Sequence, residues 1–252
     1  MVAVFLLAPL LAVVPISVTP ARFLTMPTGE LSLTHYRDLL DNPDWGRSIL
    51  LSLRIGIVSS VIATALALAF ALGIWMFQPP LSALLVGFVL LPMIVPPVVS
   101  AMILYFFLTS LSQVSGAIGY DTWLGVTLAH VVMIVPSAVV LILVALAQVD
   151  RRIDLAARGL GATVLQRAFK VILPNIRFGV LTAALMAFIL SWEEIGVTLF
   201  VTSVNAITLP RMMWMGVHDN IDPAIAAISV VLIVITTLAL VGRMLLQRDE
   251  PA

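Results

Sequence analysis

Two adjacent glutamates stand inside an apolar stretch and are the first candidates for chemistry. They end the sequence Ser191-Trp-Glu-Glu194, within a predicted membrane span. A charged side chain near the bilayer centre costs about 2.5–3.5 kcal/mol on insertion scales, so these acids need water, a cavity or a partner group. Facing a pore, Glu193 and Glu194 would attract a cationic solute. At the outer end of the span they would lie in interfacial water, and both interpretations stay open.

His130 falls inside another predicted span and also has two interpretations. It could belong to a proton relay, or a neighbouring backbone carbonyl could satisfy its ring. Prolines raise a similar choice because proline removes a backbone donor and kinks a helix. Pro92, Pro96, Pro97 and Pro136 are then either hinges along a pathway or packing kinks. The candidate pathway residues are Ser191, Glu193, Glu194, His130, Pro96 and Pro97.

Motifs of hydrolytic, phosphate-binding and metal chemistry are absent from the sequence. The chain has no cysteine, no His-Glu-x-x-His, no Gly-x-Ser-x-Gly and no Gly-x-x-x-x-Gly-Lys. His35 and His218 fall in predicted external loops and lack metal-ligand spacing. We therefore expect a protein that is not an enzyme and holds no cofactor or metal of its own. Its formal net charge of zero argues against a nucleic-acid partner.

The composition predicts an all-α integral membrane protein. Of 252 residues, 62% are hydrophobic and 10% are charged, whereas soluble domains average about 25% charged residues. A membrane helix needs about 20 mostly apolar residues. The first such segment could instead be a signal peptide, although no Lys or Arg precedes Arg22. We expect one transmembrane domain over residues 1–252, with six spans at 2–19, 49–77, 82–108, 123–147, 178–201 and 223–245.

Basic residues predict the orientation of the chain. Arginine and lysine mark the cytoplasmic loops of membrane proteins, and here they concentrate in segment 148–177 and in the C-terminal tail. Segment 148–177 should therefore be a cytoplasmic loop, and with six spans both termini should be cytoplasmic. Segment 20–47 then becomes the largest external loop, in which residues 34–40 predict a short helix on the outer surface.

One side of the cytoplasmic loop is predicted to carry little side-chain bulk. Residues 154–163 read Asp-Leu-Ala-Ala-Arg-Gly-Leu-Gly-Ala-Thr and precede Val-Ile-Leu-Pro at 171–174, a helix–turn–helix pattern. Small residues let another protein approach the backbone closely. The alternative, an amphipathic helix resting on lipid, should show a bulky apolar stripe. The pattern favours docking of a cytoplasmic protein.

This spacing resembles the EAA loop of the permeases that serve binding-protein-dependent ABC importers. In that family Glu-Ala-Ala is followed by a glycine and later by Ile-x-Leu-Pro. Leu155 stands at the Glu position, with Asp154 before it as a substitute acid, and Val171 stands for the Ile. The resemblance implies a cytoplasmic coupling loop whose ATPase-coupling residues are Asp154, Ala156, Ala157, Gly159, Gly161, Ala162, Leu173 and Pro174.

Further motifs resemble the spermidine/putrescine (PotC-like) branch of these permeases. They are the proline motif at 91–97, Ala-His-Val-Val at 129–132, the acidic motif at 187–194 and segment 208–227. The resemblance implies the MetI-like fold of type I ABC importers and alternating-access transport from periplasm to cytoplasm. It favours a polyamine such as spermidine or putrescine, while an opine, an aminophosphonate or another small polar solute stays open.

The same resemblance implies a set of partners in the bacterial inner membrane. They are a periplasmic solute-binding protein, a second permease subunit and a cytoplasmic ATPase dimer, which would carry the ATP and magnesium. The external segments 20–47 and 202–222 would meet the binding protein. A stand-alone secondary transporter or channel is the alternative class, but the inverted repeats common in such folds are not evident. A membrane-embedded enzyme would need a nucleophile–base or metal constellation, and none is found in the sequence.

Overall fold

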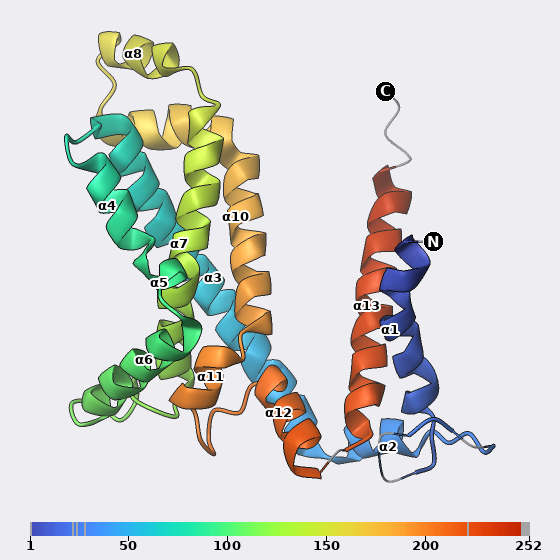
Figure 1. The fold of residues 1–252 in the computed structure, drawn as a ribbon. Coiled ribbons are helices and arrows are strands. Elements are labelled where there is room, and N and C mark those ends of the chain that lie inside the picture. The colour runs from blue at the N-terminus through green and yellow to red at the C-terminus, as the bar shows by residue number, and fades with distance from the viewer. Residues whose placement is uncertain (1, 22, 24, 28, 221, 248–252) are drawn as a thin grey trace. The chain divides into compact units, whose positions relative to one another are not determined.

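The computed structural model describes residues 2–21, 23, 25–27, 29–220 and 222–247. These residues form helices and loops, with no strand among them (Figure 1). The all-α class predicted from the composition is therefore confirmed for the described part of the chain. Among these residues, three helices are long and apolar enough to cross a membrane: Pro43–Phe77, Trp123–Ala147 and Val164–Glu193. Shorter apolar helices accompany them, and the six-span count stays a prediction.

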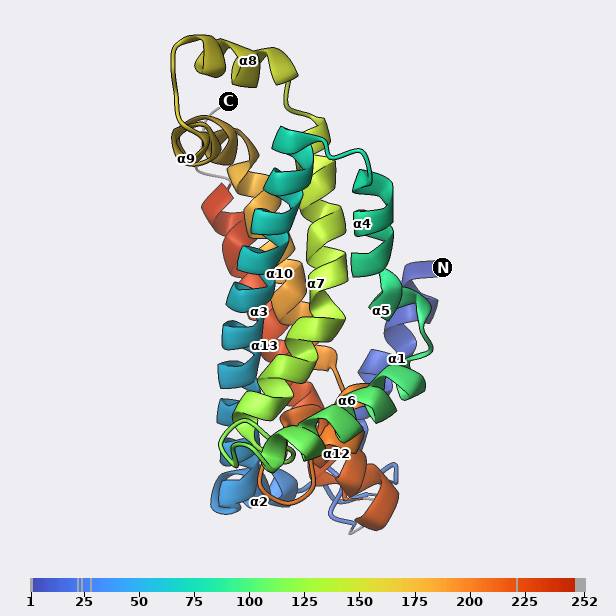
Figure 2. The ribbon, with the colours of Figure 1, turned by 90° about the vertical axis from the view of Figure 1, so that its left-hand side faces the viewer.

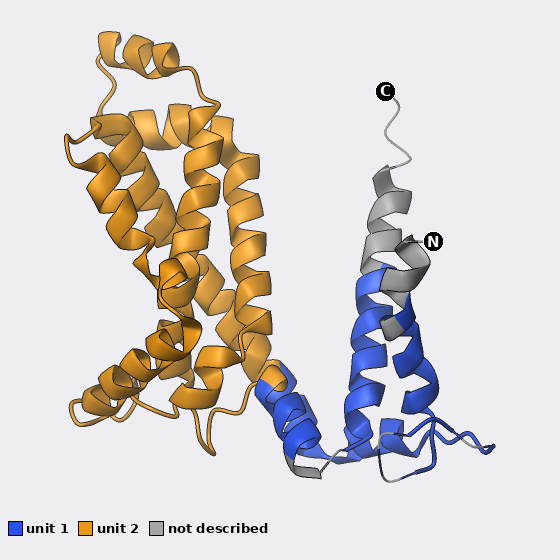
Figure 3. Cartoon of the chain, viewed as in Figure 1, with its two compact units in different colours: residues 1–49, 211–252 blue, residues 50–210 orange. Residues whose placement is uncertain are grey.

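The chain divides into two compact units, which we describe separately (Figure 3). Unit 1 comprises Met1–Ile49 and Arg211–Ala252, and unit 2 comprises Leu50–Pro210. The boundaries fall within α3 (Pro43–Phe77) and α12 (Leu209–Met215).

Unit 1 joins the two ends of the sequence. In it, α1 (Val2–Ser17) packs along α13 (Ala224–Gln247), and α2 (Thr34–Asp41) also contacts α13. The hydroxyls of Ser17 and Tyr36 lie 2.8 Å apart and tie the end of α1 to α2. The short helix expected at 34–40 is thus confirmed as α2. The π-helix η2 (Gly216–Asn220) precedes α13.

Unit 2 contains the candidate sites and is built around α7 (Trp123–Ala147), which packs along α10 (Leu173–Glu193). Gly179 permits this close approach, because a side chain there would collide with the Ala145 methyl group. Figures 1 and 2 show the same pair lying side by side in two views. The remaining elements after α3 are α4 (Ser82–Val89), α5 (Leu91–Ile94), α6 (Pro97–Ser112), α8 (Arg151–Gly159), α9 (Val164–Gln166), the π-helix η1 (Arg167–Ile172) and α11 (Gly196–Val201).

Two predicted spans, at 82–108 and 178–201, are each divided into separate helices, so their predicted boundaries were wrong. Segment 82–108 is not one helix but α4, α5 and α6. The chain turns at Leu90 between α4 and α5, and α5 and α6 are separated because Val95 and Pro96 adopt extended backbone angles, with ψ of 134° at each. Proline disfavours the helical conformation of the residue before it and cannot donate a backbone hydrogen bond. Segment 178–201 is likewise divided between α10 and α11, since Glu194 is extended, with ψ of 109°.

The other predicted boundaries differ by less. The helix expected at 123–147 is α7, with the same bounds. The span at 49–77 begins earlier, at Pro43, and the segment predicted at 2–19 ends as a helix at Ser17. The last span, predicted at 223–245, is α13. Loop 148–177 is shorter than predicted because residues 173–177 already belong to α10.

Buried apolar side chains in unit 2 gather into two larger clusters at different levels. One cluster combines residues 67–76 of α3, 138–146 of α7 and 168–183 of η1 and α10. The other combines Ile55, the middle of α6, the start of α7 and α11. Between these levels lies a small apolar group, Ala63, Ile134 and Ala187. Buried polar residues are also found on α3, α7 and α10: Ser59, Ser60, Thr64, His130 and Ser191.

Asp121 fastens the loop that follows α11. Its carboxylate accepts backbone hydrogen bonds of 2.7 to 3.2 Å from residues 203–206 and a bond of 2.8 Å from the Asn205 side-chain amide. Asp121 has a left-handed φ of 58°. Burial alone would raise the pKa of Asp121, but the backbone donors favour the carboxylate and hold its pKa below the ordinary value.

We expect Asp121→Asn to lower the free energy of unfolding by about 2–4 kcal/mol, because an amide cannot accept all of these bonds. Because the pKa of Asp121 is depressed in the folded state, its carboxylate contributes fully to the free energy of unfolding at pH values above the unfolded-state pKa of about 3.9. This stabilisation is lost as the pH falls through the folded-state pKa. Thermal unfolding in detergent at neutral and acidic pH measures it. The difference between wild type and variant should shrink on acidification.

Asp44→Asn is the matched control, since the Asp44 carboxylate is exposed and bonds only the exposed Arg47 side chain, at 3.2 Å, among the described residues. It should change stability by less than about 0.5 kcal/mol. A difference between wild type and Asp121→Asn that stays the same at both pH values would contradict the proposed role of the carboxylate charge.

Candidate functional site

The first candidate site is the helix–turn–helix segment formed by α8, a tight turn and α9. The Asp150 side chain caps the start of α8 by accepting the Arg152 N–H at 2.9 Å. At the other end, Gly161 has a φ of +79°, and the N–H groups of Gly161 and Ala162 bond the carbonyls of Arg158 and Ala157. This pair of bonds is a Schellman motif, which requires a left-handed residue at the Gly161 position. The predicted helix–turn–helix is confirmed, and the turn explains the glycine.

A second capping structure starts the following helix. Thr163 and Gln166 form a capping box in which each side chain bonds the backbone N–H of the other. These two groups satisfy donors that a helix otherwise leaves unpaired at its start. The turn between α8 and α9 is therefore fixed on both sides by its own residues.

A buried ion pair holds α8 on the rest of unit 2. Arg167 in η1 donates from Nε and Nη2 to the two Asp154 carboxylate oxygens, each at 2.7 Å. Both side chains are less than a tenth exposed, and a bidentate geometry of this kind is both strong and directional. Asp154 therefore faces inward, toward η1. Arg167 was not among the residues predicted from sequence, where it counted only as one of several loop arginines.

The predicted coupling residues do not share one surface. Ala157 is buried beside Asp154, and Ala162 and Leu173 are half-buried. The exposed members are Ala156, Gly159, Gly161 and Pro174.

Bulky apolar side chains are also exposed around these small residues. Leu155 is 59% exposed and Leu160 is 90% exposed, and Ile153, Val164 and Leu165 are exposed as well. Arg151, Arg152 and Arg158 lie exposed on the same short helix. The surface of α8 and its turn is thus mixed apolar and basic rather than uniformly small.

The second candidate site is a chain of hydrogen bonds around His130, which is 1% exposed. Its Nδ1 lies 2.8 Å from the Ser191 hydroxyl, and its Nε2 lies 3.0 Å from the Thr198 hydroxyl. Ser59 donates to Ser191 at 2.8 Å. The ring is thus buried and hydrogen-bonded, but its partners are hydroxyls rather than the backbone carbonyl that one interpretation expected.

The acidic pair divides into two different environments. Glu194 is half-buried, and its Oε1 accepts the Val197 N–H at 2.8 Å, within the first turn of α11. Glu193 is exposed, and no bond to its side chain is found within the described part of the chain. The structure thus brings Ser191, His130 and Glu194 together at the end of α10.

Pro96 and Pro97 lie at the break between α5 and α6, and both are exposed. None of the described contacts joins them to the His130 network. A mainly apolar hollow of about 190 Å³ lies beside this break. It is lined by Leu91, Pro92, Val95, Ser100, Ile103, Leu104, Val132 and Met133.

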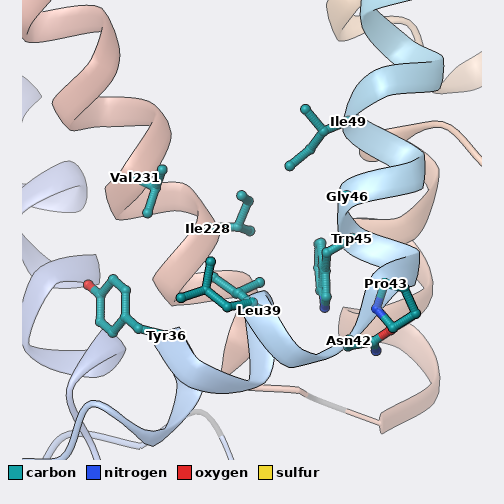
Figure 4. A pocket seen from close by; sticks show the side chains of 10 residues that line it. Tyr36, Leu39, Asn42, Pro43, Trp45, Gly46, Ile49, Ile228 and Val231 are labelled. Carbon is teal, nitrogen blue, oxygen red and sulfur yellow. The ribbon is translucent and has the colours of Figure 1, made fainter.

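Unit 1 has a larger hollow of about 460 Å³ between α2, the first turns of α3 and α13 (Figure 4). Its walls are mainly apolar, and Trp45, Ile228 and Val231 project into the space between the helices. A second hollow, of about 450 Å³, shares Trp45 and Asn42 with the first and is lined by Asp38, Asp41 and Asp222. Sequence analysis identified neither hollow, because α2 and α13 are distant in the chain.

Four residues that hold these sites or the neighbouring loop in place were missed from the sequence. Ser59 and Thr198 are ordinary hydroxyl residues in apolar spans, and nothing in their spacing distinguishes them. Asp121 had a usable signal, since it is the only Asp, Glu, Lys or Arg between Arg54 and Asp150. For Arg167 the sequence held no distinguishing signal beyond its positive charge.

The long apolar helices of the described residues define a class, a membrane-embedded helical protein. A family model described as "Binding-protein-dependent transport system inner membrane component" matches residues 65–249, and the chain belongs to this family. It is therefore a non-catalytic permease subunit of an ABC importer, located in the inner membrane. Membership implies a binding protein, an ATPase and permease partners.

Individual relatives agree with this assignment. The chain is 28% identical over 230 residues to the putrescine transport system permease protein PotI of Escherichia coli K12, covering 91% of this chain and 82% of that one. It is 32% identical over 190 residues to the molybdenum transport system permease protein ModB of the same strain, covering 70% and 81%.

A solved structure shares the fold. It is the crystal structure of a bacterial ABC transporter involved in the import of the acidic polysaccharide alginate, with a TM-score of 0.62 at 15% sequence identity. The match covers 98% of this chain and 92% of that one. At this identity the likeness shows the fold alone.

We expect Arg167→Met to destabilise the α8 segment by about 3 kcal/mol, because it leaves the buried Asp154 carboxylate with only the half-exposed Arg158 guanidinium, at 3.9 Å. The double variant Asp154→Leu/Arg167→Met should recover most of this loss, since it removes both charges. Limited proteolysis within residues 148–177, together with thermal unfolding, measures the effect. Arg152→Met, which removes an exposed arginine of α8, is the control and should leave both measurements unchanged. If Arg167→Met and the control Arg152→Met were cut by the protease to the same extent, the proposed role of the Asp154–Arg167 pair would be contradicted.

Proposed function

We propose that this chain moves a small polar solute from the periplasm to the cytoplasm by alternating access, driven by ATP and magnesium bound on a partner ATPase dimer. The observation that carries this proposal is the α8 segment, which is capped at both ends and held on unit 2 by the buried Asp154–Arg167 pair. An element anchored in this way can pass a displacement on to η1 and α10 without first deforming. Such transmission is what an ATPase-driven permease requires.

Coupling to the ATPase would use the exposed side of α8. Ala156 and Gly159 leave room for close approach, and the exposed Leu155 and Leu160 offer apolar side chains for burial. Arg151, Arg152 and Arg158 supply charge at the rim, where electrostatic complementarity guides association. Asp154 and Ala157 act from beneath, by positioning the helix. The resting-on-lipid alternative gains support from the exposed leucines, and the experiment below separates the two.

The remaining architecture follows from the same proposal. The whole chain would act as one transmembrane domain with six spans, both termini in the cytoplasm and α8 on the cytoplasmic side. A second permease subunit would complete the pathway. The external segments 20–47 and 202–222, which include α2 and α12, would meet the binding protein.

A polyamine such as spermidine or putrescine is the solute that we propose, supported by the likeness to a putrescine permease. The geometry gives narrower support, because the Glu194 carboxylate is engaged by α11 and leaves Glu193 as the acid exposed near the end of α10. An opine or an aminophosphonate would also suit one exposed acid. The chain also resembles a permease named for molybdenum transport, so the identity of the solute must be tested by experiment.

We expect Gly159→Trp to reduce ATP-driven uptake at least about tenfold, equivalent to ~1.4 kcal/mol of lost docking, while the protein still inserts in the membrane. A Cβ atom added at this exposed helical position meets no atom within 4 Å, so a larger side chain can extend away from the protein toward a partner. Gly161 is a poor site for this test, because its φ of +79° would strain any substituted residue. Transport into proteoliposomes and retention of the ATPase on affinity purification are the measurements.

Gly87→Trp in α4 is the matched control, since it is the same substitution at another exposed, open helical glycine. Uptake by this variant should stay near wild type. Normal uptake and normal ATPase retention by Gly159→Trp would refute docking at α8 and favour its resting on lipid.

The solute can be tested with the complex purified from its native membrane. We expect an ATPase, a second permease and a binding protein to accompany the chain, and the binding protein to bind spermidine or putrescine in calorimetry. Binding of an opine or an aminophosphonate but no polyamine would replace the proposed substrate and leave the importer assignment intact.

A further inference from the structure

The break between α10 and α11 is bridged by one side chain from a third helix. Ser191 lies on α10, just before the break, and Thr198 lies on α11, just after it. Both hydroxyls contact the same His130 ring, at distances of 2.8 and 3.0 Å, and His130 belongs to α7. Because α7 continues past the break as one helix, the ring fixes α10 and α11 to a common support.

Each hydrogen bond around His130 can be assigned a donor and an acceptor. Ser59 donates to Ser191, whose hydroxyl lies 2.8 Å from Nδ1 of His130 and donates to it when the ring proton is on Nε2. The Thr198 hydroxyl donates to the Glu194 carbonyl at 2.9 Å, so its oxygen accepts from Nε2. A neutral imidazole with its proton on Nε2 satisfies every one of these groups. The ring is therefore placed by two direct hydrogen bonds, to Ser191 and Thr198, and these hydroxyls are themselves oriented by Ser59 and the Glu194 carbonyl.

The position of the ring in the core makes this contact mechanically important. Val197 and Val201 of α11 pack in the apolar cluster that includes α6, whereas much of α10 packs in the other large cluster. The backbone between them is extended at Glu194, so the two helices do not share a continuous set of helical hydrogen bonds. Helix interruptions in membranes are tolerated where neighbouring groups satisfy the freed polar atoms.

We propose that His130 is a positioning residue that sets the orientation of α11 relative to α10, by holding a hydroxyl from each side of their break. Its consequence for transport rests on the proposed function, since a misplaced α11 would alter the half-pathway near Glu193 and Glu194. The geometric part does not depend on that function. Without the ring nitrogens α11 keeps its apolar packing and its bonds to Glu194, and we expect these contacts alone to leave it in more than one orientation.

The absence of cysteine from the sequence allows a direct measurement. Spin labels at Leu185→Cys on α10 and Phe200→Cys on α11, two exposed positions, report the distance across the break. The complex purified from the membrane, with all subunits that accompany the chain, is measured by double electron–electron resonance. We expect one narrow distance distribution in the otherwise unaltered chain and loss of that single peak in His130→Phe, which keeps a ring but removes both nitrogens.

Two further variants separate positioning from general loosening. Thr127→Val removes another buried hydroxyl of α7, whose only described bond is to the Trp123 carbonyl of its own helix at 2.8 Å. It should keep the narrow distribution. His130→Gln, which returns a side-chain amide near the former Nε2, should restore part of the peak. An unchanged distribution in His130→Phe, or equal broadening in Thr127→Val, would overturn the proposal.

Transport gives the second readout. We expect His130→Phe to lower the amount of solute moved per ATP hydrolysed, with Thr127→Val unchanged. An equal fall in uptake and in ATP hydrolysis, with the distance peak preserved, would indicate a merely structural role and overturn the proposal. If no ATPase accompanies the chain, the proposed function fails, and the distance comparison still decides the role of His130.

Discussion

Lipid cannot form hydrogen bonds, and this constraint governs the arrangement of unit 2. Each interruption of a membrane helix frees backbone groups that the protein itself must satisfy. At the break after α10, Glu194 accepts a backbone donor of α11, while Thr198 donates to the Glu194 carbonyl. The Asp121 carboxylate likewise accepts backbone hydrogen bonds from the loop that follows α11. The polar side chains that stand out in the sequence thus serve first to form hydrogen bonds with backbone groups that would otherwise be unpaired.

The ordered loop illustrates a related constraint at the other end of unit 2. A short helix outside the bundle gains little stability from its own hydrogen bonds, so it depends on capping and on tertiary contacts. Asp150, Gly161 and Thr163 provide the turns and caps, and the Asp154–Arg167 pair provides the attachment. These internal roles leave Ala156, Gly159 and the exposed leucines available to a partner. The family to which the chain belongs includes an ATPase among its partners, and we propose that the ATPase docks on this surface.

Substrate choice is weakly encoded in these features. Glu194 is engaged within the protein, and the hollow beside the α5–α6 break is mainly apolar. Relatives of similar sequence carry names that refer to putrescine and to molybdenum, two different solutes. The shared framework is therefore compatible with different solutes, and it fits a division of labour in which a separate binding protein contributes to selection.

The sequence by itself determined the membrane class, the helix at 123–147 and the helix–turn–helix at 154–174, because composition and local spacing act over short distances. It also predicted that the prolines would disturb a span, since proline restricts its own residue and the one before it. The tertiary structure decided which polar groups meet. Ser59, His130, Ser191 and Thr198 come from four helices, and Arg167 reaches back across a turn to Asp154. Such pairings depend on how helices pack side by side, and no local pattern of residue types specifies that packing.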